Sequence, residues 1–266
     1  MPSNKSTPDP GSGPAPGQPS SPAPGRASGP APGAGSGADV PELIWLRPER
    51  AGRGPRPAHS RASIARAALA LADAEGLEAV TMRRIAGELG AGTMSLYNYV
   101  PKKEQLLDLM LDAVCAEYQL PAAPSGDWRA DLRLLAGQQL EILRRHPWAV
   151  TIMRTRASFG PNSLRYTEFF LGALAGAELS GGRKMEALAM LNGYLCQFVE
   201  WERATLIAVR DPQQWQRDLV SYLTGVASSG DYPNIAAALS SGNAPMDPQA
   251  SFERFLEKLL TVLVEP

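Results

Sequence analysis

From residue 60 onward, apolar side chains recur every three or four positions, and Gly, Pro or a capping residue interrupts the pattern at intervals. This spacing places apolar residues on one face of a helix, whereas a strand would need them at every second position. The last such stripe consists of Phe252, Phe255, Leu256, Leu259, Leu260 and Leu263. No stretch of the sequence alternates clearly enough to predict a strand. We therefore expect an all-α protein.

The predicted helices fall into two groups. The first group begins at Ser60 or Ser63, either of which can cap a helix, and Gly76 ends its first helix. Thr81 is expected to cap a second helix and Thr93 a third one over residues 94–99, and a fourth follows Pro101. The helices expected in the second group cover 127–145, 148–155, 162–175, 183–209, 212–226 and 248–264.

The N-terminal segment has a different composition. Residues 1–38 contain 10 Pro, 8 Gly, 7 Ser and 6 Ala, so there is little apolar surface to offset the entropy lost on ordering. We expect residues 1–57 to form a disordered tail that ends in a basic arm. Arg50, Arg53 and Arg56 in this arm either bind DNA phosphates and the minor groove or belong to a solubilising linker.

Several protein classes are excluded. The chain has no apolar stretch long enough to span a membrane, and its N-terminus lacks the apolar core of a signal peptide. Two cysteines, Cys115 and Cys196, build no disulfide framework, so we expect a cytoplasmic protein. The spacing of the two histidines and two cysteines matches no metal motif, and no catalytic motif is present, so we expect neither an enzyme nor a cofactor.

Charge is unevenly distributed along the chain. The formal net charge is −1, yet residues 47–103 carry 10 basic and 5 acidic groups, whereas residues 104–266 carry 14 basic and 19 acidic groups. A basic block followed by an acidic remainder indicates two parts with different partners.

The basic block contains two short helices and a Gly-containing turn, over residues 81–99, in the proportions of a helix–turn–helix. Ile85 and Leu89 on the first of these helices, together with Ala86, are expected to pack against Leu96 and Val100. The second would then act as a recognition helix, because the major groove of B-DNA accepts one α-helix held by its apolar back.

The polar side chains of this segment suit DNA. Hydroxyl, amide and phenol groups bind base edges or phosphates, and flanking cations bind phosphates. The outward-facing candidates are Thr93, Met94, Ser95, Tyr97, Asn98 and Tyr99. The flanking basic candidates are Arg83, Arg84, Lys102 and Lys103.

Two runs carry a family resemblance. IARAALALADAEGLEAV (64–80) and TMRRIAGELGAGTMSLYNYVPKKEQLLDLM (81–110) resemble the N-terminal domain of TetR-family transcriptional regulators. The resemblance implies a three-helix DNA-binding domain over residues 58–118. Residues 127–204 are similar to the tetracycline-repressor type of C-terminal domain, which implies a helical effector-binding and dimerisation domain over 119–266.

The resemblance also implies individual roles. Thr81 and Arg83 match the family's entry to the second helix, which implies phosphate binding by both and a base contact by Arg83. Thr93, Met94 and Ser95 match the start of the recognition helix and would contact base edges. Tyr97 and Lys103 match phosphate-contact positions. Met94 and Asn98 depart from the family pattern, so the operator sequence cannot be transferred from a relative.

These observations and the resemblance predict a ligand-responsive regulator of the repressor type, which binds a palindromic operator as a homodimer and is released by a small-molecule effector. Helices 183–209 and 248–264 are the expected dimer helices, or else the second simply covers the core. The candidate effector-binding residues are Trp148, Met153, Phe159, Tyr166, Phe170, Asn192, Tyr194, Gln197 and Trp201. Ordinary core packing explains most of these equally well, and the alternative is a ligand-independent DNA-binding or partner-binding regulator.

Overall fold

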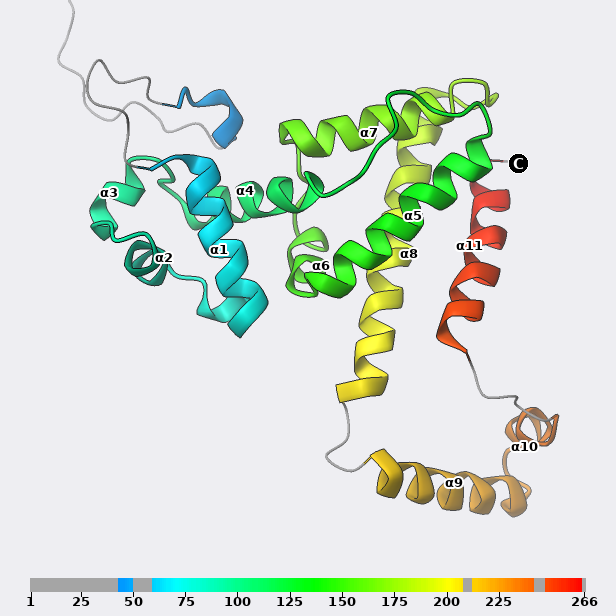
Figure 1. Cartoon of the computed structure of the whole chain (residues 1–266). Helices are drawn as coiled ribbons and strands as arrows, with labels where there is room; N and C mark the ends of the chain where they lie inside the picture. The colour runs from blue at the N-terminus through cyan, green and yellow to red at the C-terminus, as the bar shows by residue number, and fades with distance from the viewer. Residues whose placement is uncertain (1–42, 50–58, 208–211, 242–246, 265–266) are drawn as a thin grey trace, which may run out of the picture. The chain divides into compact units, whose positions relative to one another are not determined.

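The computed structural model of the chain describes residues 43–49, 59–207, 212–241 and 247–264. Within these ranges every regular element is a helix, which confirms the all-α prediction (Figure 1). The disorder predicted for residues 1–57 is wrong for residues 43–49, which contain the 3-10 helix η1 (Ile44–Leu46) with a fully buried Ile44. The rest of that prediction, including the three arginines of the basic arm, lies outside the described residues. None of the described helices is both long and apolar enough to cross a lipid bilayer.

The N-terminal part, called the head here, consists of three helices and the beginning of a fourth. The four helices are α1 (Arg61–Glu75), α2 (Met82–Glu88), α3 (Thr93–Tyr97) and α4 (Lys103–Cys115). Ser60 caps α1 in a reciprocal arrangement with Ser63, and Gly76 ends it with a φ of +86°, a conformation that glycine adopts readily. Thr81 caps α2 by accepting a hydrogen bond from the Arg84 backbone N–H at 3.3 Å. These three predictions are confirmed.

The start of α3 differs from the prediction. Thr93 is the first residue of the helix, and Gly92, which has no side chain to accept a hydrogen bond, occupies the capping position. The prediction that Thr93 caps the helix is therefore wrong. No side chain caps α3, and the backbone N–H of Ser95 instead donates to the Gly92 carbonyl at 2.9 Å.

The C-terminal part, called the body here, contains seven helices among the described residues. They are α5 (Trp128–Arg145), α6 (Trp148–Met153), α7 (Pro161–Ala173), α8 (Gly181–Ile207), α9 (Pro212–Ser229), α10 (Pro233–Ser240) and α11 (Pro248–Val264). Asp127 caps α5 as its sequence suggests, accepting from the backbone N–H groups of Arg129 and Ala130. Helix α10 was not predicted, since it has only eight residues and buries none of them.

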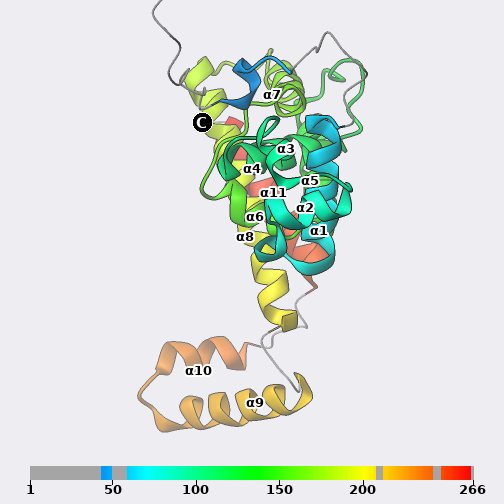
Figure 2. The ribbon, with the colours of Figure 1, turned by 90° about the vertical axis from the view of Figure 1, so that its left-hand side faces the viewer.

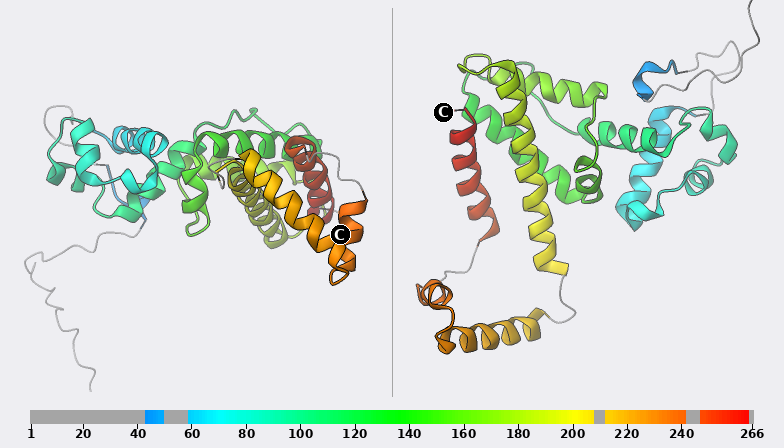
Figure 3. Two further views of the ribbon diagram at one scale, coloured as in Figure 1. Left: turned by 90° about the horizontal axis from the view of Figure 1, so that it is seen from below. Right: turned by 180° about the vertical axis from the view of Figure 1, so that it is seen from behind.

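The body is built around α5, α7 and α8, which contact one another in pairs. Phe170 of α7 and Leu191 of α8 are fully buried there, and Leu260 is the equivalent residue of α11, which packs on both α5 and α8. Figure 3 shows α8 and α11 from behind, with α5 beside them. Helix α4 contacts α1 at one end and α6 and α7 at the other, so it connects the head to the body (Figure 1).

Candidate nucleic-acid interface and the core of the body

Helices α2 and α3 form the predicted apolar seam. Ile85 of α2, Leu96 of α3 and Val100 after α3 are fully buried, and Leu89 is half-buried against them. The two helices contact each other, and Gly90 makes the turn between them with a φ of +61°. One apolar side chain, Leu96, therefore anchors the whole of the short helix α3.

The other side of α3 faces solvent. Met94 is 77 % exposed and Tyr97 41 % exposed, and Ser95 and Asn98 are exposed as well. Thr93 and Tyr99 are half-buried at the two ends of the segment. Figure 2 looks onto the side of the chain that carries α2 and α3. A helix anchored by its back with an exposed polar front has the geometry that insertion into a major groove requires.

The flanking cations differ from one another. Arg83 and Lys103 are exposed, and Thr81 is exposed at the start of α2. Arg84 instead forms a two-pronged ion pair with Glu75 of α1, with Nη1 2.6 Å from Oε2. This pair raises the pKa of Arg84 and lowers that of Glu75 through their hydrogen bonds. Arg84 therefore links α2 to α1, while Lys102 is half-buried before α4.

Two buried carboxylates connect α4 to the body. Asp112 accepts hydrogen bonds at its Oδ1 from the backbone N–H groups of Asn162 (2.9 Å) and Ser163 (3.0 Å), and its Oδ2 accepts one from the Asn162 side chain. It thereby caps α7, whose own N-cap is Gly160. One turn earlier, Asp108 forms a two-pronged pair with Arg156, with Oδ1 3.0 Å from Nε.

A second connection between head and body passes through His146, which is buried at the junction of α5 and α6. Its Nδ1 lies 2.7 Å from Oδ1 of Asp73 in α1, and its Nε2 lies 2.9 Å from Oε1 of Glu117 just after α4. Carboxylates only accept hydrogen bonds, so both bonds form together when the imidazole carries two protons. Trp148 donates its indole N–H to the same Asp73 oxygen at 2.6 Å.

The core of the body contains a polar cluster. The hydroxyl of Tyr166 in α7 donates to Oε1 of Gln139 in α5 at 3.0 Å and lies 3.4 Å from Oδ1 of Asn192 in α8. The ring of Tyr118 lies 4.6 Å from that of Tyr166, measured between centroids. Burial raises the pKa of both tyrosines well above the usual range. This cluster offers hydroxyl and amide groups inside an otherwise apolar core.

Burial also shifts the pKa values of the two cysteine thiols. It raises the pKa of Cys115 to about 12 and that of Cys196 to about 11, so both are neutral thiols at physiological pH. Cys115 is partly buried and packs against the core.

Aromatic side chains gather where α8 meets α11. The rings of Phe198 and Trp201 in α8 lie 5.6 Å apart, and Phe252 in α11 lies 5.2 Å from Phe198. Tyr194 stacks on Phe252 and donates its hydroxyl to the Phe252 backbone oxygen at 3.1 Å. Burial raises the pKa of Tyr194 to about 12. These contacts fix α11 against α8.

The nine predicted effector-binding residues do not gather into one group. Tyr166 and Asn192 join the polar cluster, whereas Tyr194 and Trp201 join the aromatic one. Phe159 is 55 % exposed, and Gln197 is exposed on α8. Trp148 donates its indole N–H to Asp73. Met153 is half-buried, and Phe170 is fully buried.

Two hollows lie along α5. The first, with a volume of about 630 Å³, lies between the segment after α4 and α5, and Glu117, Gln138 and Arg145 contribute to its wall. The second, of about 680 Å³, lies between α5 and α11, and Arg133 and Phe252 contribute to it. None of the nine predicted residues lines either hollow.

The sequence interpretation missed Gln139, Asp108 and Asp112. Each is a polar residue at a position that helical spacing assigns to an apolar face: Gln139 lies four residues after the buried Leu135, and Asp112 lies three residues after the buried Leu109. A polar side chain inside an apolar stripe is the signal that was available, because such a group is buried only with a partner.

By its fold and its exposed recognition helix, this chain is a helix–turn–helix DNA-binding protein. Residues 64–110 match the family model for bacterial regulatory proteins of the tetR family, and residues 120–263 match the tetracyclin repressor-like C-terminal domain. The chain belongs to the TetR family of transcriptional regulators.

Relatives and solved structures agree with this assignment. The HTH-type transcriptional repressor DrrR1 of Streptomyces coeruleorubidus is 39 % identical over 202 residues, which are 74 % of each chain. An HTH-type transcriptional regulator of Saccharopolyspora erythraea is 34 % identical, over 83 % of this chain and 91 % of that protein. Apo ActR from Streptomyces coelicolor superposes with a TM-score of 0.66 at 25 % identity, covering 79 % of this chain and 97 % of ActR.

ActR has also been solved with small molecules. Its complex with (S)-DNPA gives a TM-score of 0.65 at 26 % identity, over 79 % of this chain and 98 % of that one. Its complex with actinorhodin gives 0.65 at 25 % identity, over 78 % and 97 %.

Proposed function

We propose that this chain is a homodimeric repressor that binds a palindromic operator through α3 and is released when a small organic effector binds the body. The observation that carries the DNA-binding part is the geometry of α3. Leu96 is fully buried against α2, while Met94 and Tyr97 on the same helix are exposed. Because the Met94 side chain is exposed, it adds little to the packing of the head. An exposed apolar side chain on the outer face of a recognition helix is instead suited to contact bases.

The proposed DNA contacts are made by side chains that are exposed or half-buried at α3 and its flanks. Base edges would be contacted from α3, and phosphates from the residues at its flanks. The proposed base-contacting residues are Arg83, Thr93, Met94, Ser95 and Asn98, and the proposed phosphate-contacting residues are Thr81, Tyr97, Tyr99, Lys102 and Lys103. Arg84 leaves this set, because Glu75 holds its guanidinium.

Replacing Tyr97 or Lys103 by Ala tests the interface. We expect each variant to bind DNA from the promoter of its own gene about tenfold more weakly or worse, since each loses a direct contact. Lys103→Ala should also reduce the slope of log affinity against log salt by about 0.9, the effect of one lost phosphate contact. Fluorescence anisotropy over a salt series measures both quantities.

Arg217→Ala is the charge-matched control, because Arg217 is exposed on α9, outside the proposed DNA-binding and dimer surfaces, and donates to Oε1 of Gln214 at 2.8 Å. It should bind DNA like the wild type. Unchanged DNA binding in both Tyr97→Ala and Lys103→Ala would rule out α3 and the start of α4 as the interface.

The dimer proposal rests on apolar surface at α8 and α11. Phe255 and Val262 of α11 are 50 % and 71 % exposed, and they lie seven residues apart, on one face of the helix. Met185 and Met190 on the neighbouring α8 are also exposed. A second copy related by a two-fold axis would bury these side chains and present two recognition helices to half-sites about 34–36 Å apart, or a multiple of that distance.

Charged substitutions on this face should separate the dimer. We expect the double variant Phe255→Glu/Val262→Glu to sediment as a monomer at concentrations where the wild type is a dimer, because charges at the centre of an interface are strongly unfavourable. Leu164→Glu is the control, since Leu164 is an equally exposed apolar residue on α7. A monomeric wild type, or a double variant that remains dimeric, would contradict the assignment of this face.

The effector proposal is supported by the polar cluster of the body and by the ActR complexes with actinorhodin and (S)-DNPA. Tyr166, Gln139 and Asn192 supply the few convergent polar groups that small-molecule sites place among apolar walls. The second candidate is a regulator without a ligand, which the close burial of Tyr166 and Phe170 favours. Actinorhodin serves as the first probe: release of bound DNA on its addition supports ligand control directly.

A further inference from the structure

A short segment ahead of α1 is fixed to the rest of the chain. Residues 43–49, called the strap here, contain the 3-10 helix η1 (Ile44–Leu46), which contacts α4. Ile44 is fully buried, although its neighbours Leu43 and Leu46 are exposed, at 44 % and 70 %. The strap therefore packs against the rest of the chain through particular side chains such as Ile44. It is not part of the three helices that make up the head.

One end of the strap lies against the body. The ring of Trp45 packs over Gly160, the N-cap of α7: a Cβ at residue 160 would lie only 2.6 Å from Cζ2 of Trp45. The same Cβ would overlap the carboxylate of Asp112, which caps α7 from α4. Trp45 of the strap and Asp112 of α4 therefore both lie against Gly160. They can approach its backbone so closely because glycine has no side chain.

The other end of the strap is bonded to the end of the recognition helix. Nη2 of Arg47 donates to the backbone oxygen of Asn98, the C-cap of α3, at 2.9 Å. Arg61 at the start of α1 donates from Nη1 to the backbone oxygens of Ile44 (3.2 Å) and Arg47 (2.7 Å), and from Nε to that of Tyr99 (3.4 Å). The last carbonyl groups of a helix have no hydrogen-bond partners within it. Arg47 and Arg61 supply donors to the carbonyls at the C-terminal end of α3 and thereby hold that end in place.

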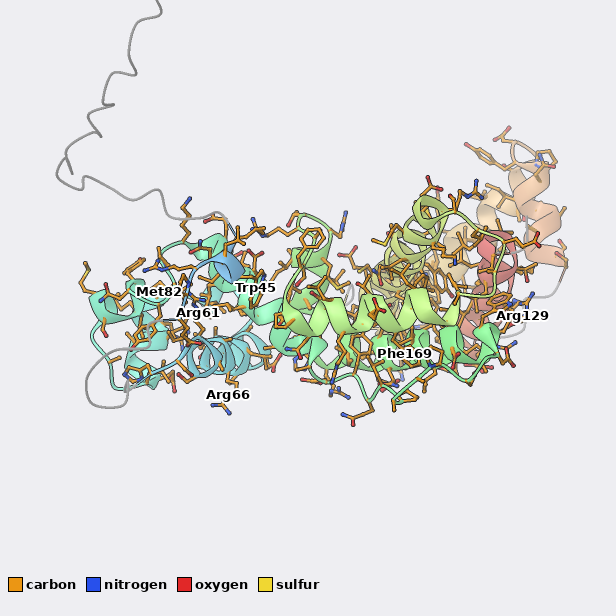
Figure 4. The ribbon with its side chains drawn as sticks, turned by 90° about the horizontal axis from the view of Figure 1, so that it is seen from above. Trp45, Arg61, Arg66, Met82, Arg129 and Phe169 are labelled. Carbon is orange, nitrogen blue, oxygen red and sulfur yellow. The ribbon has the colours of Figure 1, made fainter. Side chains whose placement is uncertain are left out.

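Arg61 is the centre of this arrangement. Its backbone N–H also donates to Oε1 of Glu49 at 2.7 Å, so the strap is bonded to it on both sides. Burial lowers the pKa of Arg61, and Glu49 opposes that shift. Figure 4 shows Trp45 and Arg61 beside each other at η1. Three backbone oxygens thus accept hydrogen bonds from Nε and Nη1 of this guanidinium, which engages Arg61 within the protein.

We propose that the strap positions the recognition helix relative to the body, through Trp45 on Gly160 at one end and through Arg47 and Arg61 on the carbonyls of Asn98 and Tyr99 at the other. It forms a third connection between the two parts, in addition to α4 and the hydrogen bonds of His146. Trp45, Arg47 and Arg61 are the positioning residues: they contact no DNA, and they set the orientation in which α3 meets it. The effect on DNA binding rests on the proposed function, whereas the effect on α3 does not.

Trp45→Ala and Arg61→Gln in the full-length protein test the strap, with Leu46→Ala as the matched control in the same segment. Two measurements are needed: hydrogen exchange of the Tyr99 and Val100 amides in the free protein, and affinity for promoter DNA over a salt series. We expect both variants to exchange faster at these amides and to bind DNA about tenfold more weakly, with the wild-type salt slope. Leu46→Ala should match the wild type in both measurements.

The outcomes separate the possibilities. A salt slope reduced by about 0.9 in Arg61→Gln would show that Arg61 binds a phosphate, and this would overturn its positioning role. Unchanged hydrogen exchange and unchanged DNA affinity in both variants would overturn the proposal that the strap positions α3. If Trp45→Ala does not fold, Trp45→Phe and Arg47→Gln, judged by the same measurements, take its place. Failure of the wild type to bind DNA would refute the proposed function, while hydrogen exchange would still decide whether the strap holds α3.

Discussion

Asp112→Ala is expected to lower the free energy of unfolding by about 3–5 kcal/mol, among the largest effects of any single substitution in this chain. Asp112 is 5 % exposed, and it accepts hydrogen bonds from two backbone N–H groups of α7 and from the Asn162 side chain. Removing the carboxylate leaves these buried donors without an acceptor. It also removes a negative charge from the positive end of the α7 dipole. Urea denaturation followed by circular dichroism measures the loss.

Two further variants identify the cause. Asp112→Asn keeps one acceptor oxygen for the backbone N–H groups but opposes its amide to the Asn162 amide, so we expect a smaller loss of about 1–2 kcal/mol. Asn162→Ala removes a single side-chain hydrogen bond and should cost about 1 kcal/mol. A loss below about 1 kcal/mol in Asp112→Ala would mean that the start of α7 contributes little to global stability.

The buried acids of α4 also show where sequence interpretation stops. Helical spacing predicted α4 and the direction of its apolar face, because Leu106, Met110 and Val114 share that face and are buried. The same spacing says nothing about which segment will face Asp108 or Asp112. Their partners, Arg156 and the start of α7, are about fifty residues away, and only tertiary packing brings them together.

The predicted elements that proved accurate are those with local causes. Capping by Ser60, Thr81 and Asp127 depends on a side chain and an amide two or three residues apart, so it can be inferred from the sequence. The seam between Ile85 and Leu96 follows from two short apolar stripes across one turn. Here the sequence alone was sufficient to predict both the helix–turn–helix and the side of α3 that faces outward.

The strap had no such local signal. Ile44 and Trp45 belong to a run of four apolar residues, 43–46, between a Pro-rich segment and an Arg-rich one, and this run is too short to show a period. Their burial depends on Gly160 and on Arg61, which lie more than a hundred and about fifteen residues along the chain. The polar cluster of the body was half predicted: Tyr166 and Asn192 were expected to lie near an effector, and Gln139, their partner on α5, was not.

Leu96→Ala is expected to lower the free energy of unfolding by about 2–5 kcal/mol, because Leu96 is fully buried and is the one residue by which α3 is anchored in the seam. Met94→Ala removes a side chain of similar size from the same helix, yet Met94 is 77 % exposed and its loss should change stability by no more than about 0.5 kcal/mol. Chemical denaturation of the two variants measures the difference.

DNA binding should separate the same pair of variants in another way. With Leu96→Ala, α3 loses its anchor, so affinity should fall for every DNA sequence. With Met94→Ala, the fold is retained and the preference should change only at the base pair that Met94 contacts, since apolar contacts in the major groove distinguish bases such as thymine by its methyl group. Selection from a randomised operator library measures that preference. An unchanged sequence preference in Met94→Ala would remove Met94 from the base-contacting set, and its exposed side chain would then need another partner.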